Sequence, residues 1–424
     1  MFKFIGYRCS LCKTEYTPAQ VTYTCPKDGG NLDVVLDYDA LRKKSVDDLI
    51  TPTDASLWRY LPLLPVDDPG GRGTPLRAAG WTPVFDVPHL RQRLGMASLW
   101  MKDESRNPSA SFKDRASAIV VARAREIKAK VVVTASTGNA GAALACMAAA
   151  VGQKAVIFAP RTAPPAKIAQ LLIFGAQVLL LDGTYDQAFD LTVQCAQEFG
   201  WYCRNTGYNP FTAEGKKTAM LEIWEWWRQL DASIRRQRPL SVFVSVGDGN
   251  IISGLHKALR DLEALHLLPE TTSKGAPYGI RLFGVQAEGS AAVANAFLAG
   301  TETITPVSAS TLADSISVDL PRDGTRAVRA VTQSGGTYLL VKDEEILAAI
   351  AEIGATGIFA EPAGATAYAG LLKAINMQKI GKDDAVLVLN TGNGLKDVKA
   401  AMQAVQQAPV IEPSLSAVKK ALET

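Results

Sequence analysis

The chain has few histidines and no long apolar run. Only three histidines occur among 424 residues, and no two have the spacing of metal ligands, which argues against a multi-histidine metal site or a histidine-based triad. A membrane-spanning helix needs about 20 consecutive apolar residues, and no segment reaches that length. The first residues lack the apolar core of a signal peptide. We therefore expect a soluble, cytoplasmic protein without a membrane partner.

An excess of either charge is also missing. The chain carries 45 basic and 42 acidic residues, which gives a net charge of +3. Such a balance gives no reason to expect nucleic acid or an anionic membrane as a partner. Hydrophobic residues make up 47% of the chain, enough for a large core, and its length predicts two or three domains.

Turn residues and prolines divide the chain into five parts. Residues 1–50 are rich in Tyr, Cys and turn residues and predict a small separate module. Residues 51–97 contain many prolines and predict a connector that wraps the core. Two α/β domains are expected at 98–240 and 241–402, and the tail over 403–424 is either mobile or a docking helix.

From residue 98, apolar runs of strand length alternate with stretches of helical period. This alternation predicts parallel sheets covered by helices on both faces. The strands are expected at Ser98–Lys102, Val131–Thr134, Ala155–Phe158, Gln177–Leu181, Ser241–Val246, Leu282–Gln286, Thr337–Val341 and Ala385–Leu389. The helices between them include Ala116–Lys128, Tyr185–Phe199 and Glu344–Ile353.

Three of these strands run into turns of the same chemistry, rich in Gly, Asn and hydroxyl or acidic side chains. The turns lie at 136–139, 247–250 and 390–394. In open parallel sheets, ligands bind beyond the carboxyl ends of the strands. The second turn precedes the helical stretch Gly254–Leu262, so its glycines and the helix start suit a phosphate. A tight turn that needs positive φ explains the same glycines, because short glycine motifs are weak signals.

Each remaining motif has a plain structural explanation when it is taken alone. Ser136 or Thr137 can cap a helix, Lys113 can be an exposed lysine, and Thr391 can be a turn hydroxyl. Together they place a lysine beside the apolar Phe112 and opposite an anion-holding turn. An enzyme that carries an aldehyde cofactor as a Schiff base needs such an arrangement, with the pKa of the lysine lowered by burial.

The combined motifs resemble those of fold-type II pyridoxal-phosphate enzymes, and most closely those of the threonine synthase family. The resemblance runs from Trp58 to Asp397. It implies a tryptophan synthase β-like α/β fold with two open parallel-sheet domains, a pyridoxal 5′-phosphate cofactor in the cleft between them, and a homodimer. The motifs that carry it are Gly80-Trp81-Thr82-Pro83, Lys102-Asp103-Glu104, Asn107-Pro108, Ser111-Phe112-Lys113-Asp114-Arg115, Ser136-Thr137-Gly138-Asn139, Glu214-Gly215-Lys216-Lys217-Thr218, Gly247-Asp248-Gly249-Asn250, Glu361-Pro362 and Thr391-Gly392-Asn393-Gly394-Leu395-Lys396-Asp397.

The resemblance also implies roles for individual residues. Lys113 would form the Schiff base with the cofactor and later move protons. Asn139 would hydrogen-bond the 3′-oxygen of the cofactor, and Thr391 would face its pyridine nitrogen without keeping it protonated. The substrate α-carboxylate would be held by Ser136, Thr137, Gly138 and Asn139. The cofactor phosphate would be bound by the loop of Gly247, Asp248, Gly249, Asn250 and Ile251.

The implied activity is that of a lyase that converts O-phospho-L-homoserine and water to L-threonine and phosphate. A β-replacement or β-elimination enzyme of the same fold, similar to cysteate synthase or threonine dehydratase, is the first alternative. A non-catalytic protein that keeps the fold is the second, and the intact Lys113 argues against it.

The amino-terminal module departs from the pattern of relatives that carry a ribbon-like segment with four cysteines. Cys9, Cys12 and Cys25 are present, and Asp28 stands in the place of the fourth cysteine. Two outcomes stay open: the three cysteines bind zinc, or the module has lost its metal and is held by apolar and tyrosine side chains.

Three further groups of residues remain to be placed. Thr212 stands where some threonine synthases carry a basic residue, which leaves Lys167, Lys216, Lys217 or Arg115 to meet the substrate phosphate. Two other clusters predict core packing and a solvated helix face, with a partner interface and a phosphate or effector site as the respective alternatives. They are the tryptophans Trp224, Trp226 and Trp227 and the arginines Arg322, Arg326 and Arg329.

Overall fold

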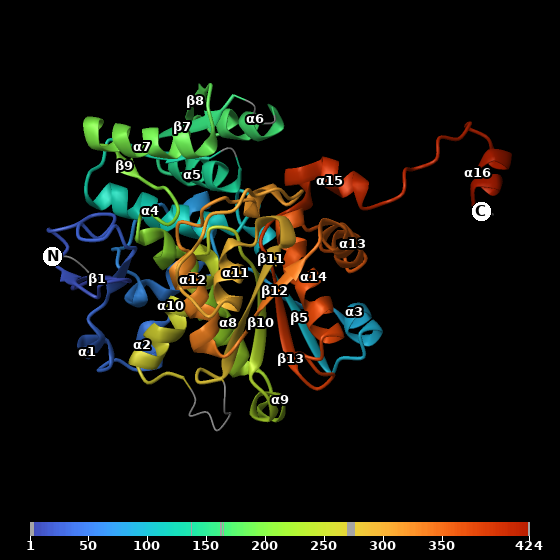
Figure 1. The fold of residues 1–424 in the computed structure, drawn as a ribbon, viewed down its shortest axis with the longest axis horizontal. Coiled ribbons are helices and arrows are strands. Elements are labelled where there is room, and N and C mark those ends of the chain that lie inside the picture. The colour runs from blue at the N-terminus through green and yellow to red at the C-terminus, as the bar shows by residue number, and fades with distance from the viewer. Residues whose placement is uncertain (1–3, 137, 162, 164, 269–275, 423–424) are drawn as a thin grey trace.

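The computed structural model describes residues 4–136, 138–161, 163, 165–268 and 276–422. Two α/β units pack against each other, and a small amino-terminal sheet lies at one side (Figure 1). No helix among the described residues combines the length and apolar character that crossing a bilayer requires.

The larger sheet has the strand order β12-β11-β10-β13-β5-β4. Its strands are parallel except β4, which runs antiparallel to β5 at the edge. β10 and β13 are buried along their whole length, as expected for central strands covered on both faces. The strands are β4 (Val84–Asp86), β5 (Ser98–Asp103), β10 (Leu240–Ser245), β11 (Ile280–Ala287), β12 (Tyr338–Val341) and β13 (Ala385–Asn390).

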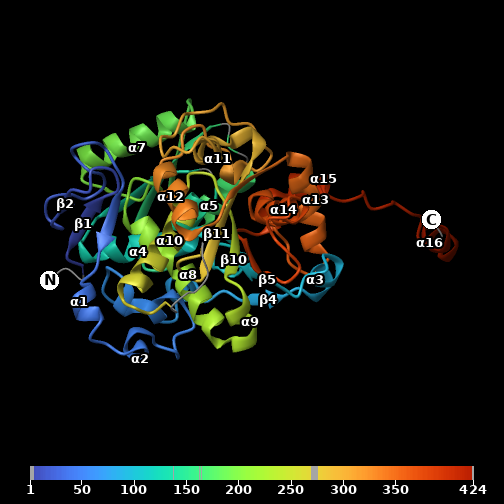
Figure 2. The same cartoon turned by 60° about the horizontal axis from the view of Figure 1, so that its bottom comes forward.

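Two groups of helices cover the two faces of this sheet (Figure 2). Alternate strand residues enter separate clusters: Val242 packs with α8, α10 and α12, whereas Phe243 packs with α13 and α14. The first group is α8 (Phe211–Gln229), α10 (Asn250–Ala264), α11 (Ala292–Leu298) and α12 (Gly324–Ser334). The second is α3 (Pro88–Arg93), α13 (Asp343–Gly354) and α14 (Pro362–Asn376).

The smaller sheet is parallel and has the order β8-β7-β6-β9. Val132 faces the main core with α5, and its neighbour Val133 faces a separate cluster with α7. The strands are β6 (Val131–Ala135), β7 (Lys154–Pro160), β8 (Gln177–Leu181) and β9 (Tyr202–Cys203). The helices of this unit are α4 (Lys113–Glu126), α5 (Asn139–Ala149), α6 (Pro165–Ile173) and α7 (Tyr185–Phe199).

The amino-terminal module is a three-stranded antiparallel sheet that is docked on the larger unit. The Tyr38 hydroxyl donates to Asp261 on α10 at 2.7 Å, and Asp33 pairs with both Arg260 and Arg326 at 2.8 Å. These contacts attach the module to the surface of the larger unit. Its elements are β1 (Gly6–Cys9), β2 (Glu15–Tyr16), β3 (Leu32–Val35), α1 (Tyr38–Leu41) and α2 (Val46–Leu49).

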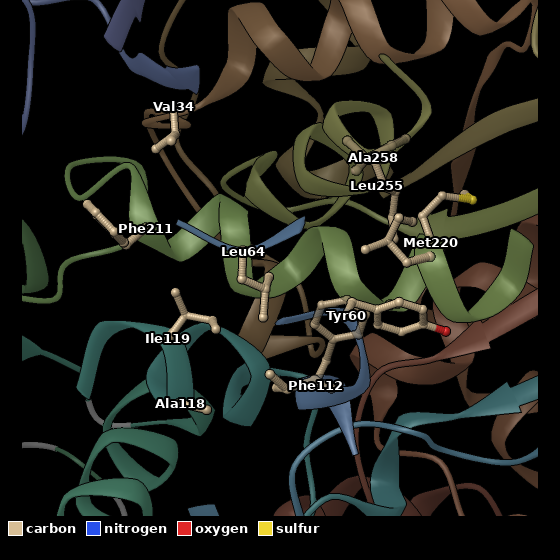
Figure 3. Packing of buried hydrophobic residues seen from close by; sticks show 14 of the residues in the cluster. Val34, Tyr60, Leu64, Phe112, Ala118, Ile119, Phe211, Met220, Leu255 and Ala258 are labelled. Carbon is tan, nitrogen blue, oxygen red and sulfur yellow. The ribbon is translucent and has the colours of Figure 1, made fainter. Parts of the chain in front are cut away.

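The connector does more than wrap the surface. It forms two short 3₁₀ helices, η1 (Leu57–Leu63) and η2 (Pro75–Ala78), and Trp58 and Tyr60 are buried in the main core. Figure 3 shows Tyr60 in one cluster with Phe112 at the start of α4 and Met220 of α8. The connector thus contributes buried side chains to the hydrophobic core that the two units share.

One strand lies in a different unit from the one expected. The run that begins at Ser98, expected to open the first α/β domain, forms β5 of the larger sheet. It pairs in parallel with β13, from Ser98 opposite Ala385 to Asp103 opposite Asn390. A run of apolar residues indicates a strand but not the sheet that it joins, so the boundary expected at residue 98 does not follow the sheets.

The carboxyl-terminal segment extends away from the two units. After α15 (Val398–Gln403), the chain runs outward to α16 (Leu415–Leu422), which has no buried residue (Figure 1). The sequence left two possibilities for this tail, a mobile segment or a docking helix. The structure does not show it docked on the described part of the chain. The remaining short elements are α9 (Ala232–Gln237), η3 (Glu104–Arg106), η4 (Glu288–Ser290), η5 (Asp314–Ile316) and η6 (Gly394–Asp397).

Candidate active site

Lys113 is the first residue of α4 and lies where the two units meet. The backbone amide of the fully buried Phe112 donates to the carbonyl of Thr391 at 2.9 Å, which ties the start of α4 to the turn after β13. No described residue accepts a hydrogen bond from Lys113 Nζ. Burial, followed by the nearby Arg204 guanidinium, lowers the pKa of Lys113 below its ordinary value. The amine is therefore nucleophilic closer to neutral pH than a surface lysine is.

The three turns singled out in the sequence border one small enclosed pocket of about 40 Å³. β10 and β13 are parallel neighbours and end on the same side of one sheet, and the turn after β6 of the other sheet meets them at the pocket. The site residues that line the pocket are Lys113, Asn139, Gly247, Asp248, Gly249, Asn250, Ile251 and Thr391.

The turn at 247–250 is held close to the neighbouring segments by its glycines. Gly249 has φ +88°, and a Cβ there would lie 2.7 Å from the Cβ of Ala327. A Cβ on Gly247 would lie 2.8 Å from the Cα of Ile316. Both glycines are thus required by packing, and the positive φ of Gly249 places it directly before the 15-residue helix α10. The first amides of that helix have no intrahelical acceptor and suit an anion.

Lys216, from α8, lines the same enclosed pocket. Its side chain is fully buried, and Nζ donates to Asn250 Oδ1 at 2.6 Å. Burial, together with the positive charges of Lys113 and Arg204, holds the pKa of Lys216 well below its ordinary value. The sequence offered this lysine as one of four partners for a substrate phosphate, and the structure places it at the glycine turn instead.

Asn139 is oriented by a buried carboxyl group that sequence analysis quoted in a motif without assigning it a role. Asn139 Nδ2 donates to Glu361 Oε1 at 2.7 Å, and burial raises the pKa of Glu361. Glu361 precedes α14 and lies against Gly392, where a Cβ would overlap the carboxyl group. The signal available in the sequence was the Glu361-Pro362 pair, which marks a helix start.

A larger cavity of about 280 Å³ adjoins Lys113. One wall is the start of α5, where the Gly138 amide donates to Ser136 Oγ at 3.2 Å and where Asn139 begins the helix. Another part of the wall is the segment from Asp314 to Arg322. Thr137, expected beside Ser136, lies outside the described residues. The positive end of α5 suits a carboxylate on this side of Lys113.

Two of the four cations considered for the substrate phosphate are engaged elsewhere. Arg115 is fully buried and pairs with Glu104 at 2.7 Å and Glu222 at 2.5 Å. Lys217 is also buried, and it pairs with Asp261 at 2.9 Å and with Glu214. Neither lines the pocket or the cavity, so both candidates were wrong: these cations join secondary-structure elements instead.

The other two candidates lie beside the site. Lys216 lines the enclosed pocket, as described above, and Lys167 borders a small side pocket, where it pairs with Asp314. Thr212, which stands in the position of a basic residue, bonds to Asn209 and to Asn250 Oδ1 at 3.2 Å. It therefore contributes to the same network as Lys216.

The tryptophan cluster and Arg326 have structural roles. Trp224 and Trp227 are buried, and the Trp226 ring meets Trp100 edge-on at 5.1 Å, which confirms the prediction of core packing. The prediction of a solvated arginine face was wrong at Arg326, which is buried and pairs with Asp323 and with Asp33 of the amino-terminal module. Long-range partners of this kind cannot be inferred from helical spacing.

The three cysteines of the amino-terminal module converge with Asp28. One possible ligand atom from each of Cys9, Cys12, Cys25 and Asp28 lies within 4.8 Å of the others. The sulfurs of Cys12 and Cys25 are 3.7 Å apart, and Cys9 Sγ lies 3.3 Å from Asp28 Oδ1. A Cβ on Gly30 would lie 2.8 Å from Cys9 Sγ, so a glycine is needed beside the cluster.

Comparison with known proteins agrees with this geometry. Residues 76–392 match the family model described as "Pyridoxal-phosphate dependent enzyme". The threonine synthase of Methanocaldococcus jannaschii is 33% identical over 98% of this chain and 99% of its own length. That of Methanosarcina acetivorans is 35% identical over 98% of each chain.

Solved structures share the fold. Threonine deaminase isoform 2 from Solanum lycopersicum has a TM-score of 0.63 and 23% identity, over 85% of this chain and 91% of its own. Maize serine racemase has a TM-score of 0.62 and 21% identity, over 81% and 91%. The expected fold class is therefore confirmed. With a family match over most of its length and near full-length relatives that are threonine synthases, this chain belongs to the family of pyridoxal-phosphate-dependent enzymes.

Proposed function

We propose that this enzyme is a threonine synthase, which converts O-phospho-L-homoserine and water to L-threonine and phosphate. The observation that carries the proposal is Lys113, a half-buried amine without a carboxylate partner among the described residues, at the point where three glycine- and asparagine-containing turns meet. Relatives named threonine synthase align with the chain over nearly its full length, which supports the choice of substrate.

The residues of the pocket fit pyridoxal phosphate. The amides at the start of α10 and the Lys216 amine would hold its phosphate, and the Thr391 hydroxyl would face its ring nitrogen. Ser245 Oγ is buried in the wall of the same pocket and has no hydrogen-bond partner among the described residues. A buried hydroxyl without a partner is costly, so this group also indicates a polar ligand.

Bound at this site, the cofactor supplies an aldehyde and a conjugated ring that withdraws electrons from the substrate Cα. The protein's own groups do the rest. Ser136 Oγ and the amide of Gly138 would hold the α-carboxylate, so that Cα lies within reach of Lys113. Lys113 Nζ would remove the Cα proton, and a Cβ proton would then be lost as the γ-phosphate leaves. A proton would be returned to Cγ, and water would add its hydroxyl to Cβ while a proton returns to Cα.

A substrate panel tests this proposal. Purified holoenzyme would be incubated separately with O-phosphohomoserine, O-phosphoserine and threonine, and phosphate, amino acids and 2-oxobutyrate would be measured. We expect phosphate and threonine in equal amounts from O-phosphohomoserine alone. Phosphate from O-phosphoserine would indicate a β-replacement enzyme, and 2-oxobutyrate from threonine would indicate a dehydratase. Absence of turnover with all three would contradict the proposal.

We further propose that Cys9, Cys12, Cys25 and Asp28 bind one zinc ion. Zinc–sulfur bonds of about 2.3 Å in a tetrahedral site separate two sulfurs by about 3.8 Å. The 3.7 Å between Cys12 and Cys25 fits this geometry. Elemental analysis of the purified protein is expected to give one zinc per chain, and none in Cys12→Ser. A wild-type protein free of metal after growth with zinc would instead indicate a module that has lost its ion.

The homodimer that the resemblance implies stays a proposal as well. Light scattering coupled to size-exclusion chromatography is expected to give twice the mass of the chain, and the mass of one chain would contradict it.

A further inference from the structure

We propose that Arg322 recognises the dianionic group at the end of the substrate side chain, and that Asp186 holds this arginine until a substrate arrives. The inference rests on the proposed function, which requires a cationic partner for the γ-phosphate. Neither Arg115 nor Lys217 can take that role, because both are buried in ion pairs elsewhere.

Arg322 lies in the wall of the cavity that adjoins Lys113. Among the described residues that line this cavity, Arg322 is the only arginine, and Lys113 is the only other cation. The remaining charged residues of the wall are Asp186, Asp248, Asp314 and Asp319. A guanidinium presents paired N–H donors that match two phosphate oxygens, which a single ammonium group does not. Arg322 is therefore the side chain best suited to a phosphate group here.

The guanidinium of Arg322 is held loosely. Its Nη2 donates to Asp186 Oδ1 at 2.9 Å, and the side chains of this pair are 30% and 52% exposed. It also lies over the ring of Phe189, at 4.8 Å from the centroid. Exposed ion pairs contribute little to stability, so a dianion in the cavity can replace the single carboxylate at small cost.

The backbone of Arg322, in contrast, is fixed on both sides. Its amide donates to Asp248 Oδ1 at 3.1 Å, and its carbonyl accepts from Asn31 Nδ2 at 3.0 Å. A Cβ on Gly207 would lie 2.6 Å from the Cβ of Arg322. The backbone of the arginine is thus fixed next to the glycine turn, while its side chain is free to exchange Asp186 for a ligand in the cavity.

This arrangement also explains how the chain functions without a basic residue at position 212. The hydroxyl of Thr212 is engaged by Asn209 and Asn250, so it offers nothing to the cavity. Arg322 packs on Gly207, a few positions before Thr212 in the chain, and supplies the positive charge there. The α-carboxylate would bind at Ser136 and Gly138, which line the same cavity together with Lys113.

Steady-state kinetics of the holoenzyme with O-phosphohomoserine test the inference. Arg322→Gln is expected to raise KM by about 10- to 100-fold, the effect of losing charge-assisted hydrogen bonds. Arg322→Lys keeps the charge and should recover part of the loss. Asp186→Asn removes the competing carboxylate, so it should lower KM about 2- to 5-fold. A higher KM in Arg322→Gln together with a lower KM in Asp186→Asn would indicate an ion pair that breaks when the substrate binds.

Four further measurements keep the test decisive. Arg161→Gln breaks an exposed arginine–aspartate pair outside the cavity, with 3.2 Å between Arg161 and Asp182, and should leave KM unchanged. The visible absorbance of the cofactor and the melting temperature should be the same in Arg322→Gln as in wild type. Inorganic phosphate should inhibit wild type competitively and inhibit Arg322→Gln at least 10-fold more weakly.

The outcomes separate the two proposals. If wild type does not turn over O-phosphohomoserine, the proposed function fails. If wild type turns it over but Arg322→Gln keeps the same KM and the same inhibition by phosphate, the role of Arg322 is refuted while the function stands.

Discussion

Two regions of the molecule bury positive charge in opposite ways. Beside α8, Arg115 and Lys102 meet Glu104 and Glu222, and all four side chains are at most 2% exposed. The neighbouring charges raise the pKa of Arg115 and hold that of Glu222 at about 2. In the pocket, Lys113 and Lys216 form no ion pair with any described residue, and burial lowers the pKa of both.

The difference separates cations that join elements of the fold from amines that line the candidate site without an ion-pair partner among the described residues. A paired charge satisfies its partners, so it joins elements and offers nothing to a small molecule. A buried amine without a carboxylate is held toward its neutral form and gains most from an anion or an aldehyde. The same residue types, a few positions apart on α4 and α8, therefore have different roles.

The largest expected effect is on the amine of the pocket. Lys113→Ala should lower turnover of O-phosphohomoserine by more than about 1,000-fold, because the group that attacks the aldehyde and moves the Cα proton is lost. The visible absorbance of the bound cofactor should shift or vanish. The melting temperature of the apoprotein should not fall, since no ion pair is broken. Retained activity would show that another amine does this work.

The next largest effect is expected on stability, in the group of buried ion pairs around Arg115. Arg115→Met leaves Glu104 and Glu222 buried with one partner fewer, which should lower the free energy of unfolding by roughly 3–5 kcal/mol. Urea denaturation measures this. Arg106→Met is a matched control: Arg106 is 60% exposed and lies 3.2 Å from Asp103, so its loss should cost less than about 1 kcal/mol. Equal costs would remove the distinction between the regions.

Lys216 tests whether the second amine serves the cofactor. Lys216→Met should weaken cofactor binding by about 10- to 100-fold, because a charge-assisted hydrogen bond to the phosphate is lost. The apoprotein should be as stable as wild type, since removing a buried amine offsets the hydrogen bond lost to Asn250. Dialysis against increasing cofactor, followed by absorbance, gives the affinity. If Lys216→Met left the affinity for the cofactor unchanged but destabilised the apoprotein, Lys216 would belong with the cations that stabilise the fold.

His256 is a third kind of buried basic group, one that stays neutral. Its replacement is expected to have the smallest effect, a change in how the free energy of unfolding depends on pH. Burial lowers its pKa to about 3, whereas an unfolded chain has a histidine pKa of about 6.5. Its contribution to stability is full above the unfolded pKa and is lost as pH falls from there toward 3. Between pH 7 and 5.5, wild type should lose about 1 kcal/mol more than His256→Gln in urea denaturation. Equal losses would contradict the assignment.

The strands and helices were predictable because the residue pattern that forms each of them lies within its own stretch of sequence. Gln177–Leu181 and Tyr185–Phe199 have the predicted bounds, since apolar runs and helical period depend only on nearby residues. The turns after β10 and β13 could be expected on one side, because neighbouring strands of a parallel sheet end together. The turn after β6 belongs to the other sheet, and only the family resemblance placed it in the same cleft.

Contacts between distant parts of the chain were not predictable. The sheet that β5 joins depends on residues 385–390, and the burial of Lys216 depends on how α8 packs between α4 and α10. The partners of Arg115 lie 11 and 107 positions away in the chain. A lysine on a helix looks the same in the sequence whether it faces solvent, a carboxylate or a pocket.

The position of β13 has a consequence for how the protein is made. This strand lies between β10 and β5, yet it is synthesised after all other strands of its sheet. A ribosome-bound chain therefore carries two separated halves of a sheet, each with an open edge, until residue 390 has emerged. Nascent chains halted before that point are expected to aggregate and to need chaperones, and the turn after β13, which lines the candidate site, forms only once this strand has joined the two halves of the sheet.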